Sequence, residues 1–543
     1  MSATDLLALL PIICLGYGAL IVLLVGAFWR SHAGIVALTV AALAASVLTS
    51  WLALGVTPRQ VTPLVRVDVF ALAYLVLFAL GAAALTAFSW DYLSAIARGR
   101  ERYYCLLLLA VAGMGVLAAS SHFAAFFLGL ETLSVSLYGL IGFTLRRPQS
   151  LEASLKYLVL AGVSLSFLLL GMALIYFQFG TMEFAAIAKL LGPGVDSPLD
   201  LARNGARLSG VEAPPYLVLL GLGLILVGFG FKLALVPFHN WAPDVYEGAP
   251  APVSALVATG SKAAMFALLV RFASLLMRAG PPLVLLLTLL AIITMFGGNL
   301  LALLQRNLKR LLAYSSVAHM GYLLIPLLAG QALGGPAIWF YFVCYFIATI
   351  GAFGVISALA GGGVGEELTE LEHYRGLGFR RPWIGAALGL MMLSLAGIPL
   401  TAGFMAKLYI FTAAARSGLW LLLVVGVVNS GIAAYYYLRV LTVLYSPDEG
   451  AGEPWPRVRP ASGVALGVLS VLLVFFGLFP GPLIDRAEGI SRRFLQNSTA
   501  TTMHRALVAP PVRQELAPAT GHTVRTAVRP YRSPKDTARA RSE

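Results

Sequence analysis

Five charged side chains stand within long apolar stretches of this sequence. Glu131 lies in "FFLGLETLSVSLYGL", and Lys156, Lys232, Lys262 and Lys407 each lie in or at the edge of a separate apolar run. An ionisable group deep in a bilayer costs roughly 2.5–3.5 kcal/mol on insertion scales, so it is usually paired, hydrated or functional. Carboxylates and lysines can both hold and release a proton. These residues are therefore candidate sites of proton transfer.

A lysine near the end of a span can instead extend its ammonium group to the lipid headgroups, and this interpretation stays open for Lys156. Lys232, Lys262 and Lys407 favour a functional role because each adjoins an irregular or glycine-rich stretch. Polar backbone would accompany the charge at those places. Arg271 is better explained as a structural charge.

Helical spacing extends two of these candidate sites. Glu131, Ser134 and Tyr138 fall at positions i, i+3 and i+7 and therefore share one face of a helix. Ser315 and His319 share a face in the same way. A lone histidine is more often structural, and its hydroxyl-bearing neighbours keep a proton-relay role open for His319.

The elements that must position these residues are membrane helices. The chain has 543 residues, of which 59% are hydrophobic and 11% charged, more apolar surface than one soluble core could bury. Apolar stretches of about 20 residues, each long enough to cross the bilayer, predict an all-α polytopic membrane protein with about fourteen transmembrane helices. We expect them near residues 6–29, 33–55, 69–90, 103–119, 122–144, 152–178, 214–236, 253–277, 281–304, 311–330, 335–360, 383–415, 418–445 and 461–480.

Two of the expected helices, the seventh and the twelfth, carry a proline that breaks them. Pro237 cannot donate to the carbonyl of Leu233, and Pro399 cannot donate to that of Leu395. The freed carbonyls would be costly in lipid, so they should face protein or water. A packing kink would explain either proline alone. Because the breaks occupy corresponding positions of two halves, they predict two inverted-topology five-helix repeats with sites near the midplane.

The predicted organisation has five parts. Residues 1–102 hold helices 1–3, residues 103–280 the first repeat (helices 4–8), residues 281–446 the second repeat (helices 9–13), residues 447–480 the last helix, and residues 481–543 a basic tail. The tail is rich in Arg, Pro, Ser and Thr, and we expect it to be disordered and solvated. Attraction of its arginines to anionic lipid or to a neighbouring subunit is the alternative.

Charge and cysteine content set further limits. Lys and Arg are more frequent in one alternating set of loops, which predicts that these loops face the cytoplasm and that both termini lie on the other side. The net charge of +14 includes the tail, and nothing in the sequence points to nucleic-acid binding.

Cys14, Cys105 and Cys344 lie in apolar runs without metal-ligand spacing, so we expect neither a disulfide nor a metal site.

Three motifs carry a family resemblance. They read "FKLALVPFHNWAPDVYEGAPAPVSALVATGSKAA" (231–264), "QRNLKRLLAYSSVAHMGYLL" (305–324) and "LSLAGIPLTAGFMAKLYIF" (393–411), with "GLETLSVSLYGL" (129–140) upstream. In order and spacing they resemble the antiporter-like membrane subunits of proton-pumping NADH:quinone oxidoreductase, respiratory complex I, over roughly residues 60–445. The first motif looks like that of N-type subunits. Mrp-type cation/proton antiporter subunits, which are not similar in "PDVYEGAPAP", are the alternative.

The resemblance implies roles for individual residues. Glu131 would pair with Lys232, Lys262 would be the central relay lysine, and Lys407 would lie towards the exit side. Lys156 matches a further lysine of the sixth span. On this reading, Asp244 and Glu247 of the first motif lie in a loop, and Glu131 is the better partner for Lys232.

The resemblance also implies an assembly. The chain would be a non-redox subunit of a translocase, in which partner subunits oxidise NADH and reduce quinone while this subunit moves protons. The sequence has no Rossmann motif after a strand, no iron–sulfur cysteine pattern and no haem-ligation pattern. NADH, FMN, iron–sulfur clusters and quinone are therefore expected in the partners, which would be L-, M-, K-, J-, A- and H-like membrane subunits and a peripheral arm. The expected location is a bacterial inner membrane.

Overall fold

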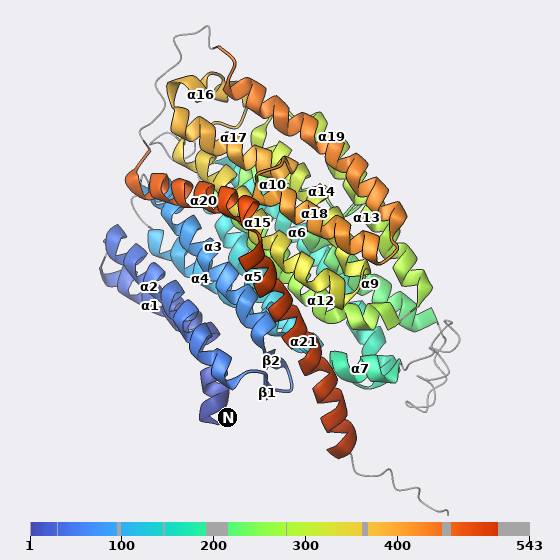
Figure 1. Cartoon of the computed structure of the whole chain (residues 1–543). Helices are drawn as coiled ribbons and strands as arrows, with labels where there is room; N and C mark the ends of the chain where they lie inside the picture. Colours follow the sequence, from blue (N-terminus) through green and yellow to red (C-terminus); the bar gives the residue numbers. More distant parts are fainter. Residues whose placement is uncertain are drawn as a thin grey trace, which may run out of the picture. The chain divides into compact units, whose positions relative to one another are not determined.

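The computed structural model describes residues 2–29, 31–94, 99–144, 147–191, 216–278, 280–360, 367–447 and 458–508. Within these ranges the chain is a bundle of long helices, with one short antiparallel hairpin of β1 (Arg59–Thr62) and β2 (Val65–Val67) between the second and third helices (Figure 1). This arrangement confirms the predicted all-α polytopic fold class.

The helices of the described residues fall into two halves of the chain. The first half comprises α1 (Ala3–Phe28), α2 (His32–Ala53), α3 (Val69–Ser94), α4 (Arg100–Ala119), α5 (Phe123–Ile141), α6 (Pro148–Phe179), α7 (Phe184–Leu190), α9 (Tyr216–Leu233), α10 (Trp241–Gly248), α11 (Ala251–Leu256) and α12 (Lys262–Arg278). The second half comprises α13 (Pro281–Leu303), α14 (Leu308–Leu328), α15 (Gln331–Ala358), α16 (Leu377–Arg380), α17 (Pro382–Ala396), α18 (Ala402–Arg416), α19 (Trp420–Leu444), α20 (Pro460–Leu478) and α21 (Gly481–Val508). Short helical turns η1 (Leu54–Val56), η2 (Val257–Ser261) and η3 (Leu371–Tyr374) complete the described elements.

Thirteen helical segments among the described residues are long and apolar enough to cross a membrane. One of them, Ala251–Arg278, joins α11, the π-helical turn η2 and α12. The expected twelfth span is divided between α17 and α18, which are too short to count individually. The thirteen segments together with this pair agree with the predicted number of about fourteen.

The helix bounds are consistent with interruptions in the seventh and twelfth spans. Helix α9 ends at Leu233 and α10 begins only at Trp241, while α17 ends at Ala396 and α18 begins at Ala402. A non-glycine residue with positive φ stands in each gap, Ala234 at 56° in the first and Leu400 at 73° in the second. L-residues rarely adopt this conformation because of steric cost, so the surrounding structure must hold each break in place.

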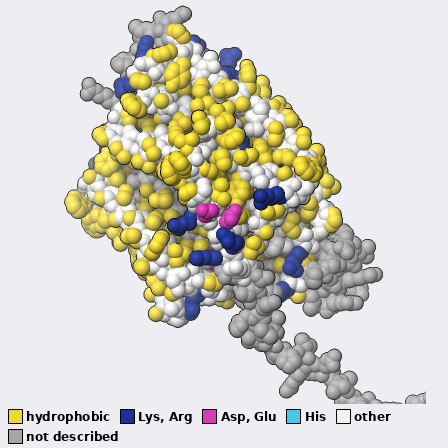
Figure 2. All heavy atoms as spheres, viewed as in Figure 1, with side chains coloured by type: hydrophobic (Ala, Val, Ile, Leu, Met, Phe, Trp, Pro, Cys, Tyr) yellow, Lys and Arg dark blue, Asp and Glu magenta, His cyan; other side chains and the backbone are white. Residues whose placement is uncertain are grey.

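Burial separates the helices into an inner and an outer set. The segments Ala251–Arg278 and Gln331–Ala358 are fully buried in their most apolar windows, whereas α1, α2, α6 and α20 have about a third or less of theirs buried. Yellow apolar side chains accordingly dominate the visible face in Figure 2. Exposed apolar surface on this scale suits contact with lipid, and the protected inner helices are where a charge can be held away from it.

The prediction of disorder from residue 481 onwards is wrong for the first part of the tail. Residues Gly481–Val508 form helix α21. Leu483, Ala487 and Ser491 recur every four residues, and all three are buried. This spacing gives the first part of α21 one face that packs on the bundle, a signal that the high Arg content of the tail obscures. Residues 509–543 lie outside the described residues.

A buried ion pair fastens the start of α3 to α12. Arg271 donates two hydrogen bonds to the Asp68 carboxylate, at 2.6 and 3.0 Å, and its Nε donates to the carbonyl of Ala118. The guanidinium also lies 5.1 Å from the ring centre of Phe70 and 5.4 Å from that of Phe494 on α21. Each nitrogen of the Arg271 guanidinium therefore donates a hydrogen bond outside α12. This agrees with the structural role expected for Arg271.

Replacing Arg271 with methionine should destabilise the protein by about 3–5 kcal/mol, because Asp68 would stay buried without its partner. The double variant Arg271→Met/Asp68→Leu should recover most of that loss. Unfolding of the detergent-solubilised protein measures both. Arg278→Met, at the exposed end of the same helix, is the matched control; it loses one hydrogen bond to the carbonyl of Ala188 and should cost about 1 kcal/mol or less. Equal losses for Arg271→Met and Arg278→Met would contradict the structural role.

Candidate functional site

Lys232 is buried in the last turn of α9. Its Nζ donates to the hydroxyl of Ser134 at 2.7 Å and to the hydroxyl of Tyr157 at 3.0 Å, and it lies 5.0 Å from the centre of the Tyr157 ring. The break after Leu233 ends the helix one residue beyond this ammonium group, and Trp241 Nε1 donates to the freed carbonyl of Phe231. The lysine thus sits where a helix stops, among neutral hydrogen-bond acceptors.

Glu131 lies on the same helix face as Ser134, as the spacing predicted, and is only partly buried. Among the residues that the structure describes, no hydrogen bond or ion pair joins it to Lys232. The direct partner of the lysine is Ser134, one turn further along α5. The predicted Glu131–Lys232 pair therefore stays a prediction.

Lys262 follows the π-helical turn η2 and is fully buried. Its Nζ donates to the hydroxyl of Ser316 on α14 at 2.6 Å, and the same hydroxyl lies 3.2 Å from that of Tyr246 on α10. A π-helical turn inserts extra backbone into a helix and commonly marks a functional site. Here it immediately precedes the lysine.

His319 lies one turn beyond Ser315 on α14 and connects two tyrosines. Its Nδ1 lies 2.5 Å from the hydroxyl of Tyr341 on α15, and its Nε2 lies 3.2 Å from the hydroxyl of Tyr437 on α19. The Tyr437 hydroxyl is also hydrogen-bonded to Ser315. Ser315, Tyr437, His319 and Tyr341 therefore form a continuous hydrogen-bonded chain in the bundle interior.

Lys407 is buried in α18, beside the second break. Its Nζ donates to the carbonyl of Ala396 at 2.7 Å and to the hydroxyl of Ser430 on α19 at 3.0 Å. Ala396 is the last residue of α17, so the lysine satisfies a carbonyl at the helix end. Gly403 permits the close approach of α17 and α18, because a Cβ there would lie only 1.8 Å from the carbonyl oxygen of Ser394.

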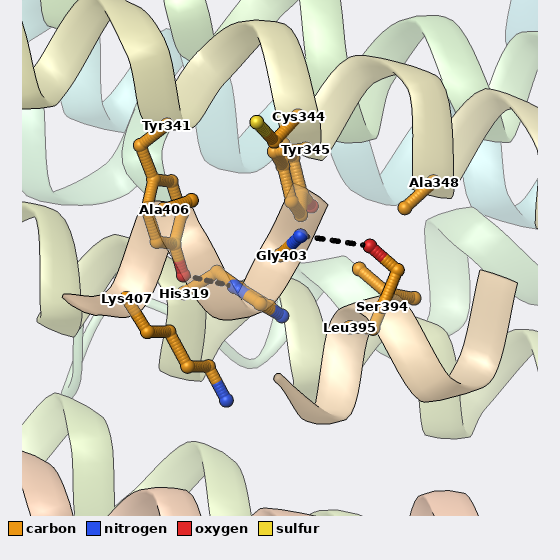
Figure 3. A pocket seen from close by; sticks show the side chains of 10 residues that line it. All are labelled: His319, Tyr341, Cys344, Tyr345, Ala348, Ser394, Leu395, Gly403, Ala406 and Lys407. Atoms are coloured by element: carbon orange, nitrogen blue, oxygen red, sulfur yellow. Dashed lines mark hydrogen bonds between the residues drawn. The ribbon is translucent and has the colours of Figure 1, made fainter. Parts of the chain in front are cut away.

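A small cavity lies between His319 and Lys407. Tyr341, Ser394 and Gly403 are among the residues that line it, and Figure 3 shows the His319–Tyr341 and Gly403–Ser394 hydrogen bonds at its wall. Its free volume of about 10 Å³ is near the minimum for one water molecule. Because the wall is partly polar, one water could hydrogen-bond there.

Lys156 stands apart from the three buried lysines. Its side chain is 43% exposed and pairs with Glu152 at 2.7 Å and with Asp244 at 2.9 Å. The sequence interpretation placed Asp244 and Glu247 in a loop, but both lie in helix α10, where Arg310 pairs with each carboxylate. The loop prediction is wrong: Pro243 lies in the first turn of α10, where a proline is tolerated.

Sequence reasoning missed most of the tyrosines that surround these lysines. Tyr157, Tyr246, Tyr341 and Tyr437 come from four different helices, and each contacts a lysine, a histidine or a serine of the site. Tyrosines are common in apolar spans, so their type alone gave no signal. The convergence of Tyr246, Tyr341 and Tyr437 on α14 appears only in the fold.

This site defines a class of membrane protein: a helical bundle with a series of buried lysines, held by hydroxyl and carbonyl groups beside interrupted helices. The family model described as "NADH:quinone oxidoreductase/Mrp antiporter, TM" matches residues 120–433. A curated relative from Ectopseudomonas mendocina (strain ymp), NADH-quinone oxidoreductase subunit N, is 43% identical over 493 residues, which cover 89% of this chain and 96% of the relative. The chain belongs to the family of NADH:quinone oxidoreductase and Mrp antiporter membrane subunits.

Solved structures agree with the fold. A chain of respiratory complex I from Thermus thermophilus is 36% identical with a TM-score of 0.73, and the match covers 88% of this chain and 98% of that one. A chain of the Mrp complex from Dietzia sp. DQ12-45-1b has a TM-score of 0.75 at 21% identity, covering 92% and 99%. The second likeness concerns the fold alone.

The ion pairs of Asp244 with Lys156 and Arg310 should make the stability of the folded protein depend on pH. Burial alone would raise the pKa of Asp244, but hydrogen bonds from Lys156 and Arg310 outweigh it and lower the pKa below the ordinary value. These ion pairs should therefore stabilise the protein above about pH 4 and lose this effect as pH falls through the lowered pKa. The gap in unfolding temperature between wild type and Asp244→Asn should be constant from pH 6 to 8 and shrink in acid. A difference in unfolding temperature that persists unchanged at about pH 3 would contradict the stabilising role of the Asp244 carboxylate. Glu372→Gln, which removes a carboxylate from an exposed ion pair, is the control.

Proposed function

We propose that this chain is the N-type membrane subunit of a proton-pumping NADH:quinone oxidoreductase and that it carries protons along its buried lysines. One observation carries the proposal: Lys232, Lys262 and Lys407 are all buried, yet their direct hydrogen-bond acceptors among the described residues are hydroxyl and carbonyl oxygens. A buried ammonium without a carboxylate partner can lose its proton and leave no unpaired acid behind. The 43% identity to subunit N supports the assignment within the family.

The proposed path runs from one half of the chain to the other. Lys232, with Ser134 and Tyr157, forms the first station, and Lys262, with Ser316, forms the second. Ser315, next to Ser316 in the chain, begins the hydroxyl chain that continues through Tyr437 and His319 to Tyr341. The small cavity then separates His319 from Lys407, the last station. Internal water would have to bridge the remaining gaps.

At the first station, the attraction between Glu131 and Lys232 in contact would be comparable to the energy needed to move one charge against the membrane potential. An opposite charge at about 4 Å attracts a lysine by roughly 4 kcal/mol at an effective dielectric near 20. Moving one elementary charge against about 200 mV costs about 4.6 kcal/mol. In the structure Glu131 is not in contact with Lys232. A conformational step that brings the two together would therefore hold a proton on Lys232, and their separation would release it.

The redox reaction belongs, in this proposal, to other subunits. NADH, FMN, iron–sulfur clusters and quinone would be bound by the peripheral arm and by other membrane subunits, and this chain would supply only the proton path. Its location would be a bacterial inner membrane, with both termini on the non-cytoplasmic side. An Mrp-type cation/proton antiporter subunit is the alternative that the shared fold allows. Exchange of sodium for protons in vesicles without NADH would favour that alternative.

The relay is tested in the assembled enzyme reconstituted into vesicles, by measuring protons translocated per NADH oxidised. Lys232→Ala should reduce proton flux through this subunit by about 100-fold or more, since a positioned proton carrier contributes about that much. Glu131→Ala should also reduce the flux. Lys189→Ala, which removes an exposed lysine on α7, should leave it unchanged. Unchanged rate and stoichiometry in Lys232→Ala would defeat the relay assignment.

The hydroxyl chain is tested by Tyr437→Phe, which keeps the ring and removes the hydroxyl that joins Ser315 to His319. A hydrogen bond is worth about 1 kcal/mol, so the flux should fall by roughly five- to tenfold. Tyr103→Phe removes another buried tyrosine hydroxyl, bonded to Ser89 away from the lysines, and is the matched control. If both variants pump at the wild-type rate, protons do not use this chain.

A further inference from the structure

A second, larger cavity lies away from the lysines. Its volume is about 630 Å³, within the range of ligand-binding sites. The walls come from the end of α2, the beginning of α3, the beginning of α15 and the first part of α21. Most of the lining is apolar, as with Val47, Trp51, Leu72, Val76 and Trp339. Such a surface would hold hydrocarbon better than water.

The polar side of this cavity is supplied by α21. Arg486 and Arg493 both line it, and because they are seven residues apart they lie on one face of the helix. Both are exposed, and neither has a hydrogen bond or ion pair with any described residue. Asp485 lines the cavity as well, which leaves a net positive charge. Figure 2 shows charged side chains gathered over the first part of α21 on a face that is otherwise largely apolar.

The wall that carries these arginines is fixed to the bundle. Phe494 stacks on Phe70 of α3 with ring centres 4.7 Å apart, and the Arg271 guanidinium packs against both rings. Leu483 and Ala487 are buried on the same helix. The cavity is therefore bounded by packed helices on the sides named above, and its shape exists before a ligand arrives.

We propose that this cavity binds one phospholipid with an anionic headgroup. The acyl chains would lie along the apolar wall, and the headgroup phosphate would lie near Arg486 and Arg493. The cavity is at the ends of membrane-spanning helices, where α2 finishes and α3 starts, which is the depth at which headgroups lie. A free phosphate ion would match the arginines but not the apolar wall, so the combined chemistry selects a lipid.

The test uses the assembled membrane complex, delipidated in neutral detergent and titrated with brominated phosphatidylglycerol. Bromine quenches nearby indoles, and the signal is the quenching that disappears when Trp51 and Trp339 are both replaced by phenylalanine. Each arginine near a surface should strengthen binding by about fivefold, so Arg486→Gln/Arg493→Gln should weaken it by roughly 25-fold. Gly489→Phe should abolish binding without a change in charge, because a side chain added there enters open space in the cavity.

Two controls make the result decisive. Arg416→Gln/Arg492→Gln removes the same charge at a different cavity and should leave the quenching unchanged. Brominated phosphatidylcholine should bind at least tenfold more weakly than phosphatidylglycerol. Equal quenching by the two lipids, or wild-type binding by Arg486→Gln/Arg493→Gln, would overturn the proposal. Displacement of the lipid by millimolar inorganic phosphate, with no effect of Gly489→Phe, would assign the arginines to a free anion instead.

Discussion

The cost of holding an ammonium group inside an apolar bundle governs this structure. The structure meets this cost in two ways. Lys309 is fully buried against Glu367, with Nζ 2.6 Å from the carboxylate, and Arg271 is buried against Asp68. Lys232, Lys262 and Lys407 have only neutral oxygen atoms as direct partners among the described residues. The first solution fixes a charge permanently, whereas the second lets a group change its protonation state without stranding a buried acid.

Irregular backbone supplies one of the neutral partners, the carbonyl of Ala396, whereas side-chain hydroxyls supply the others. The carbonyls in the last turn of a helix lack an intrahelical donor, so the carbonyl of Ala396, where α17 ends, accepts from Lys407 instead. The π-helical turn before Lys262 and the end of α9 after Lys232 are the corresponding features beside the other two lysines. Each lysine thus lies beside a departure from helical geometry, and lipid tolerates that departure only because the inner helices are enclosed by outer ones.

The hydroxyl groups around α14 connect the two halves of the chain. Tyr246 of the first half and Tyr437 of the second contact neighbouring serines, Ser316 and Ser315, on this one helix. Adjacent residues on a helix point in directions about 100° apart, so α14 presents hydroxyls towards both halves at the same depth. This makes α14 the structural link between Lys262 and the region of His319.

The sequence by itself determined the membrane class and nearly all the spans, because hydropathy acts through local physical chemistry. Proline and isolated charges also led it to predict two interrupted spans and six candidate proton-carrying residues. Spacing alone placed Ser134 with Glu131 and Ser315 with His319. Only the tertiary structure decided the partners: that Lys232 contacts Ser134 and Tyr157, that Lys156 pairs with Asp244 on α10, and that the first part of α21 packs on the bundle. Such contacts join residues far apart in the chain, and they depend on how helices pack, which no local pattern specifies.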